Sequence, residues 1–116
     1  MVRAAGEGLT AVDRTFAALA DPSRRAVVDL LRKAPRRASD IAEALSLSRP
    51  AMSRHLRVLR KTGLVEEEGV EHDARVRVYR LRRQPFTDLR GWLDGVESFW
   101  ADQLAAFKAH AERRRP

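Results

Sequence analysis

The chain of 116 residues is long enough for one domain with a single modest core. It has no cysteine, which excludes disulfides, thiolate metal sites, cysteine nucleophiles and thiol redox switches. No apolar run reaches the roughly 18 residues of a transmembrane helix, and the N-terminus lacks the basic and apolar regions of a secretory signal. We therefore expect a cytoplasmic protein that does not bind membranes.

The net charge of +7 is concentrated in residues 24–61, the basic segment. This segment carries 11 Lys and Arg against three acids, a net charge of +8, whereas the other residues carry 12 against 13, a net charge of −1. Clustered cations displace the counterions of a nucleic acid and steer the encounter with it. The alternative is a basic face that is only solvated, and the local pattern decides between the two.

The first third of the chain predicts a flexible arm and two helices. Residues 1–9 contain two glycines and little apolar periodicity, which is typical of a flexible N-terminal arm. A first helix with Thr10 as its N-cap is expected to run through Ala20, with apolar side chains along one stripe. Asp21-Pro22 starts a second helix to about residue 33, because Asp caps free amide groups and Pro fits the first helical position. Residues 35–37 predict a connector.

Two short helices joined by a minimal turn come next. The first is opened by Ala38 or Ser39 and runs through Leu45. The second is expected over residues 48–62, with a serine as its N-cap and Gly63 as the residue that ends it, because glycine adopts the left-handed conformation most readily. Two helices joined in this way are typical of a helix-turn-helix unit.

The remainder predicts a β-hairpin and a long helix. Residues 64–65 and, beyond an acidic loop with Gly69, residues 75–79 alternate and include β-branched side chains, which predicts two antiparallel strands. Pro85 is expected to end this region, and a long helix follows over residues 86–113. The predicted fold class is therefore mostly α with a small β-hairpin wing, a winged helix-turn-helix in the order α-α-α-α-β-β-α.

One domain, responsible for DNA binding and dimerisation, is expected to span residues 10–112. It lies between the arm and a basic tail over residues 113–116. The DNA-binding role depends on the helix over residues 48–62, which contains five Lys and Arg and no acid. Ordinary surface helices mix charges of both signs, whereas an all-basic polar face suits the major groove, where Arg can hydrogen-bond to guanine in bidentate fashion.

The histidines and potential nucleophiles form no recognisable catalytic or metal site. His55 borders the apolar stripe of its helix and is expected to pack there, His72 lies in a loop and His110 lies near the C-terminus. Their spacing matches no metal site, and nothing in the sequence brings a nucleophile, a base and an orienting group together. We therefore expect no enzyme, no catalytic residue, no metal and no cofactor.

The last predicted helix is about 25 residues, or roughly 40 Å, long. Apolar side chains occur at helical spacing along its whole length, which is more than a small helical head can cover, and Trp and Phe suit interface centres. A two-fold homodimer would place two recognition helices about one DNA turn apart and favour an inverted-repeat operator. The predicted interface residues are Phe16, Trp92, Val96, Phe99, Trp100, Leu104 and Phe107.

Two motifs carry a family resemblance. The first motif, residues 16–25, resembles the opening motif of one family of transcription regulators and reads Phe-Ala-Ala-Leu-Ala-Asp-Pro-Ser-Arg-Arg. The second resembles the recognition helix and first strand of the same family. It comprises residues 48–59, Ser-Arg-Pro-Ala-Met-Ser-Arg-His-Leu-Arg-Val-Leu, and residues 63–65, Gly-Leu-Val. Over about residues 12–110 the chain resembles the ArsR/SmtB transcription repressors, which are small homodimeric winged-helix proteins that leave DNA when an inducer binds. The resemblance implies repression and DNA contacts from the exposed side of the fourth helix, with support from the wing.

The sequence departs from the metal-sensing members of that family. Those members use cysteines in the third helix or sets of Asp and His in the terminal helix. Here residues 38–45 hold no soft ligand, and only His110 and Glu112 lie close together in the terminal helix. Ser46 stands at a turn position that often holds glycine, where a left-handed conformation costs roughly 1 kcal/mol.

The wing is more acidic than contact with phosphates favours. Acids occupy residues 66–68, Glu71 and Asp73. We therefore expect the tip to stand off the DNA and leave Arg75 and Arg77 as its contacts. The complete predicted set of DNA-binding residues is Ser48, Arg49, Pro50, Ser53, Arg54, Arg57, Arg75 and Arg77.

Two alternative functions stay open at this point. A winged-helix module for protein contacts would show exposed apolar residues where Arg49, Arg54 and Arg57 stand. A nucleoid-type protein would bind DNA without sequence preference. The operator and the inducer, whether a small molecule or a protein, are not specified by the sequence.

Overall fold

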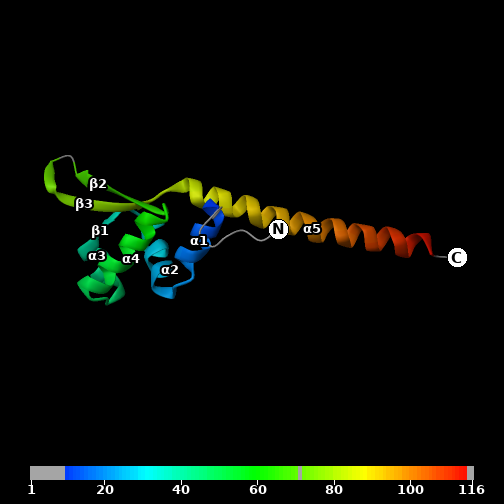
Figure 1. Cartoon of the computed structure of the whole chain (residues 1–116), viewed down its shortest axis with the longest axis horizontal. Helices are drawn as coiled ribbons and strands as arrows, with labels where there is room; N and C mark the ends of the chain where they lie inside the picture. Colours follow the sequence, from blue (N-terminus) through cyan, green and yellow to red (C-terminus); the bar gives the residue numbers. More distant parts are fainter. Residues whose placement is uncertain (1–9, 71, 115–116) are drawn as a thin grey trace.

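The computed structural model describes residues 10–70 and 72–114, so the predicted arm and the end of the predicted tail lie outside the described residues. Figure 1 shows a compact head from which one long helix extends, with overall dimensions of 75 × 35 × 27 Å. The elements in chain order are α1 (Ala11–Leu19), α2 (Pro22–Leu31), β1 (Arg36–Arg37), α3 (Ala38–Leu45), α4 (Arg49–Lys61), β2 (Val65–Val70), β3 (Asp73–Leu81) and α5 (Arg83–Arg113).

The starts of α1 and α2 follow the predicted caps. The Asp13 amide donates to Thr10 Oγ1 at 3.1 Å and the Thr10 amide donates to Asp13 Oδ2 at 2.9 Å, which forms a reciprocal capping box. Asp21 accepts from the Ser23 amide at 2.7 Å and the Arg24 amide at 3.2 Å. Desolvation alone would raise the pKa of the Asp21 carboxyl, but hydrogen bonds from these amides and nearby cations outweigh it, and the pKa is lowered. The cap therefore stabilises α2 while Asp21 is ionised and weakens when acid protonates it.

Arg24 and Arg25 hold the end of α1. Arg24 donates to the carbonyl oxygens of Ala18 at 2.6 Å and Ala17 at 3.2 Å, and Arg25 donates to that of Leu19 at 2.6 Å. Cationic side chains at the end of a helix satisfy carbonyl groups that have no intrahelical partner. Two cations of the basic segment therefore serve helix capping, which its charge count could not reveal.

The helix-turn-helix unit is closed by two residues with positive φ. Ser46 ends α3 at φ 53° and ψ 41°, in the left-handed conformation that the sequence predicts for this turn. Leu47 packs against the core between the two helices. Gly63 ends the turn after α4 at φ 85°, where a side chain would be strained. The core that these turns enclose consists of Ala18, Val27, Val28, Leu31, Ile41, Ala42, Met52, Leu56, Leu59, Leu64 and Val65.

The sheet is larger than the predicted hairpin. Its three antiparallel strands lie in the order β1-β3-β2. The segment predicted as a connector contains β1, in which Arg36 and Arg37 pair with Tyr79 and Val78 of β3. A strand of two residues has no periodicity that a sequence could show, and it forms only because β3 pairs with it. Residues 66–69, predicted as a loop, continue β2. Although glutamate is a poor strand former, these acids gain arginine partners across the hairpin.

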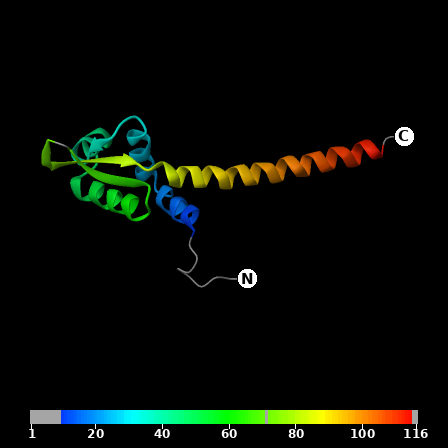
Figure 2. The same cartoon turned by 90° about the horizontal axis from the view of Figure 1, so that it is seen from above.

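α5 begins two residues before Pro85, so the prediction that this proline ends the wing region is wrong. Proline is tolerated in the first helical turn, where its missing N–H would have had no partner. α5 spans 31 residues, or about 46 Å, and only its beginning packs on the head. There the rings of Phe16 and Trp92 meet edge-to-face with centroids 5.3 Å apart, and α5 then leaves the head as a free rod (Figure 2).

Candidate nucleic-acid interface

The first turns of α4 present a basic face to solvent. Ser48 caps the helix by accepting a hydrogen bond from the Ala51 amide at 3.2 Å, so this hydroxyl has a structural partner. Met52, Leu56 and Leu59 are buried, as the predicted stripe requires, and orient the helix. The other predicted contacts of this helix, Arg49, Pro50, Ser53, Arg54 and Arg57, are all exposed.

The arginines of this face are available to a ligand. Within the part of the chain that the structure describes, Arg49, Arg54 and Arg57 form no ion pair and donate no side-chain hydrogen bond to the protein. An unpaired guanidinium has five donors that match the acceptors of guanine or phosphate. These arginines can therefore contact DNA without first breaking a bond within the protein.

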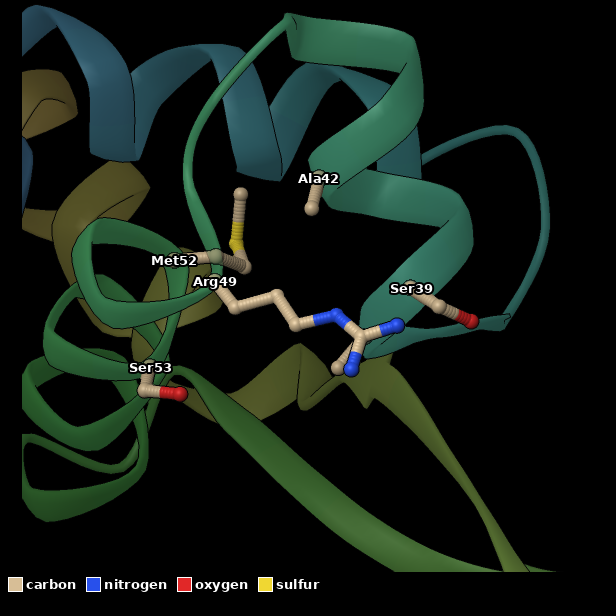
Figure 3. Close-up of a pocket in the computed structure, with 6 residues that line it drawn as sticks. Ser39, Ala42, Arg49, Met52 and Ser53 are labelled. Atoms are coloured by element: carbon tan, nitrogen blue, oxygen red, sulfur yellow. The ribbon is translucent and has the colours of Figure 1, made fainter.

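A recess of about 320 Å³ separates α4 from α3. Met52 and Ala42 line its apolar side, and Arg49 reaches across it from α4 toward the start of α3 (Figure 3). Ser39, in the first turn of α3, lies on the rim and is exposed. Ser39 is not among the predicted DNA contacts. The first helix of a helix-turn-helix unit crosses the DNA backbone, so the position of Ser39 at the start of that helix could have indicated a contact.

The two predicted wing contacts are both exposed and both have acidic neighbours. Arg75 lies next to Asp73, with Nε and Oδ1 3.5 Å apart, and Arg77 lies next to Glu67, with Nε and Oε1 3.8 Å apart. The pairing of β2 with β3 shifts register between Gly69 and Val70, so Arg75 lies in an irregular stretch of the hairpin and Arg77 at its regular end. The positive charge of both wing arginines is thus partly neutralised within the protein.

Glu67 connects the hairpin to the end of α4. Its Oε2 lies 2.9 Å from Nη1 of Arg60, and its side chain is only 21% exposed. Tyr79 stands opposite Glu67 on β3. Partial burial raises the pKa of the Tyr79 phenol, and the negative charge of Glu67 raises it further, while Arg60 and Arg77 act in the opposite direction. The sequence shows an acidic stretch here but not this partner of Glu67, because Arg60 lies on a different element.

The neighbouring glutamates of β2 are paired on the opposite face of the hairpin. Arg80 lies 2.6 Å from Glu66 and 3.3 Å from Glu68, and Arg82 lies 4.0 Å from Glu66. Successive strand residues point to opposite faces, which explains why Glu67 has different partners from its two neighbours.

No metal site is formed within residues 10–70 and 72–114, where no three His, Cys, Asp or Glu side chains gather as ligands. His55 is half-buried in α4 and lies near Asp21 at the start of α2. None of the helices in these ranges carries an apolar stretch of the length that crossing a bilayer takes.

The predicted dimer residues form a continuous exposed apolar stripe, the α5 stripe. Phe16 is 44% exposed, and exposure along α5 rises from 37% at Val96 to 71% at Leu104 and Phe107. Near the head, Gly91, Gly95 and neighbouring rings line an open recess of about 400 Å³. So large an apolar surface is unusual for a monomer and indicates a partner. The predicted residues of the stripe, all exposed, are Phe16, Trp92, Val96, Phe99, Trp100, Leu104 and Phe107.

Comparison with known proteins agrees with this architecture. Residues 21–67 match the sequence model of a family described as bacterial regulatory protein, arsR family. Over 95 residues the chain is 38% identical to the HTH-type transcriptional regulator Rv2034 of Mycobacterium tuberculosis, an alignment that covers 82% of this chain and 83% of that protein.

Two solved structures extend the similarity to most of the chain. An ArsR-like transcriptional regulator from Rhodococcus sp. RHA1 superposes with a TM-score of 0.76 at 31% identity, covering 92% of this chain and 95% of that one. The homodimeric winged helix-turn-helix DNA-binding domain Mb0332 of Mycobacterium bovis superposes with a TM-score of 0.58 at 26% identity, covering 87% and 94%. With these similarities and an exposed basic α4, the chain belongs to the arsR family of bacterial regulatory proteins and is a DNA-binding transcriptional regulator of the winged helix-turn-helix type.

Proposed function

We propose that the protein represses transcription by binding an inverted-repeat operator as a homodimer. The observation that carries this proposal is the exposed face of α4, on which Arg49, Arg54 and Arg57 have no partner within the described residues. Each α4 enters a major groove, with Ser53 beside Arg54 and with Ser48 and Pro50 at the start of the helix. Arg75 and Arg77 of the wing contact the flanking backbone.

The homodimer is supported by the α5 stripe, which lies outside the core of the head. A two-fold axis that passes through this stripe would pack two copies of α5 against each other and leave both α4 helices accessible to DNA. The similar domain from Mycobacterium bovis is described as homodimeric. Two reading helices held at a fixed spacing cover two half-sites, so the bound dimer would occupy promoter DNA that the polymerase needs.

The exposed face of α4 also favours this proposal over a protein-contact module. Such a module would need exposed apolar side chains on this face, where the described structure has arginine, serine and proline. A nucleoid-type protein shares the basic face but lacks sequence preference. Competition between random DNA and a chromosomal fragment recovered from occupied sites separates these two functions, because only the operator-specific protein prefers the fragment.

Binding should depend strongly on salt. If three cations of each protomer that reach the DNA backbone, Arg57, Arg75 and Arg77, bring about six phosphates of the site into contact with the dimer, log K should fall linearly with log salt, and affinity should drop roughly 10³-fold between 50 and 200 mM. Fluorescence anisotropy with a labelled operator fragment measures this slope. A flat response would contradict an electrostatic interface.

A further inference from the structure

Glu67 is the acidic partner of two exposed cations at the junction of α4 and the hairpin. Its carboxylate lies 2.9 Å from Arg60 and 3.8 Å from Arg77, two cations from different elements. Both arginine side chains are more than half exposed, whereas Glu67 is 21% exposed. A phosphate approaching the same cations would meet an anion already in position.

We propose that Glu67 is an internal competitor for DNA phosphate, which keeps Arg60 and Arg77 partly neutralised and so limits the sequence-independent affinity of the wing. This inference rests on the proposed docking of α4 and the wing on DNA. It adds an acidic residue to that interface, and the residue acts against binding there.

The position of Arg60 connects this pair to the reading helix. Arg60 lies in the last turn of α4 and, with Arg57 and Lys61, lines an open cationic recess of about 380 Å³. Arg57 and Lys61 have no ion-pair partner among the described residues, whereas Arg60 has Glu67. The row of cations along α4 is therefore neutralised at one place, where it meets the hairpin.

The effect on binding follows from counterion release. Sequence-independent affinity depends on the number of phosphates that the protein neutralises, and each one contributes about −0.9 to the slope of log K against log salt. A carboxylate that stays beside Arg60 and Arg77 reduces that number. A larger share of the operator affinity must then come from base contacts by Arg49 and Arg54.

The matched pair E67Q and E68Q tests this inference. Both remove one negative charge from adjacent residues of β2, but Glu68 pairs with Arg80 on the other face of the hairpin. We expect E67Q to raise the affinity for operator and random DNA by the same factor, roughly threefold or more, and to steepen the salt slope of the dimer by roughly two units, about 0.9 for each protomer. E68Q should change neither quantity measurably. Thermal melting verifies that both variants are folded.

Two outcomes would overturn the proposal. If E67Q and E68Q behave alike, only net charge matters; if E67Q weakens binding, Glu67 positions its arginines for DNA rather than competing for them. R60A provides an independent measurement, because it should reduce random-DNA affinity more in the E67Q background than in the wild type. The operator preference of α4 is measured separately with R54A, so a failure of this proposal is distinguishable from a failure of the proposed function.

Discussion

Replacing Trp100 with glutamate should convert the dimer into a folded monomer. Trp100 is 66% exposed in the protomer, and the ring contact described for it is with Phe99 on the same helix, at 5.7 Å between centroids. A tryptophan at an interface centre contributes roughly 2–4 kcal/mol, and a two-fold interface contains it twice. Sedimentation velocity should show one species of monomer mass, far-UV circular dichroism should retain the helical signal, and operator binding should fall by at least about 100-fold.

Ala105→Glu is the matched control, because it introduces the same charge on α5 outside the stripe. Ala105 lies nine residues after Val96, or about two and a half helical turns, and therefore on the opposite side of the helix. This variant should remain dimeric and bind the operator normally. A folded W100E protein that still sediments as a dimer would place the interface elsewhere.

Arg54→Ala should reduce operator binding selectively. If Arg54 forms bidentate hydrogen bonds with a guanine, its loss costs roughly 1–3 kcal/mol on the operator and much less on random DNA. Arg54 is exposed in the second turn of α4 and has no partner within the described chain, so its removal breaks no contact of the free protein. Gel-shift titrations with both DNAs measure the specificity ratio directly.

Lys61→Ala supplies the contrast, since Lys61 is the last residue of α4 and we expect it to reach phosphate alone. It should weaken binding to operator and random DNA equally and reduce the magnitude of the salt slope by about one unit for each protomer, or roughly two for the dimer. A general loss of charge predicts the same behaviour for both variants. If Arg49→Ala and Arg54→Ala both leave the specificity ratio unchanged, α4 does not read bases.

Local signals in the sequence predicted most of the head correctly. Thr10 and Asp21 act as caps, and Ser46 and Gly63 adopt left-handed conformations at the predicted turns. Each of these features depends on a few neighbouring residues, which a sequence displays directly. The exposed basic face of α4 follows in the same way from its helical spacing and its buried stripe.

Apart from the start of α5 at Pro85, the errors concern contacts between residues far apart in the chain. β1 exists because Arg36 pairs with Tyr79, and residues 66–69 continue a strand because they pair with residues 77–80 of β3. The pairing of Glu67 with Arg60 likewise joins the hairpin to α4. None of these partners lies within a local window, so the sequence predicted a connector, a loop and an acidic tip.

The separation of the α5 stripe from the core of the head has a consequence for gene dosage. Because the head has a core of its own, a folded monomer can exist before it finds a partner, and assembly then depends on protein concentration. Where monomers dominate, the concentration of DNA-binding dimer follows the square of the monomer concentration, so halving the protein lowers the dimer about fourfold. Control of the regulated promoter would then respond to small changes in the amount of regulator more steeply than a monomeric protein allows.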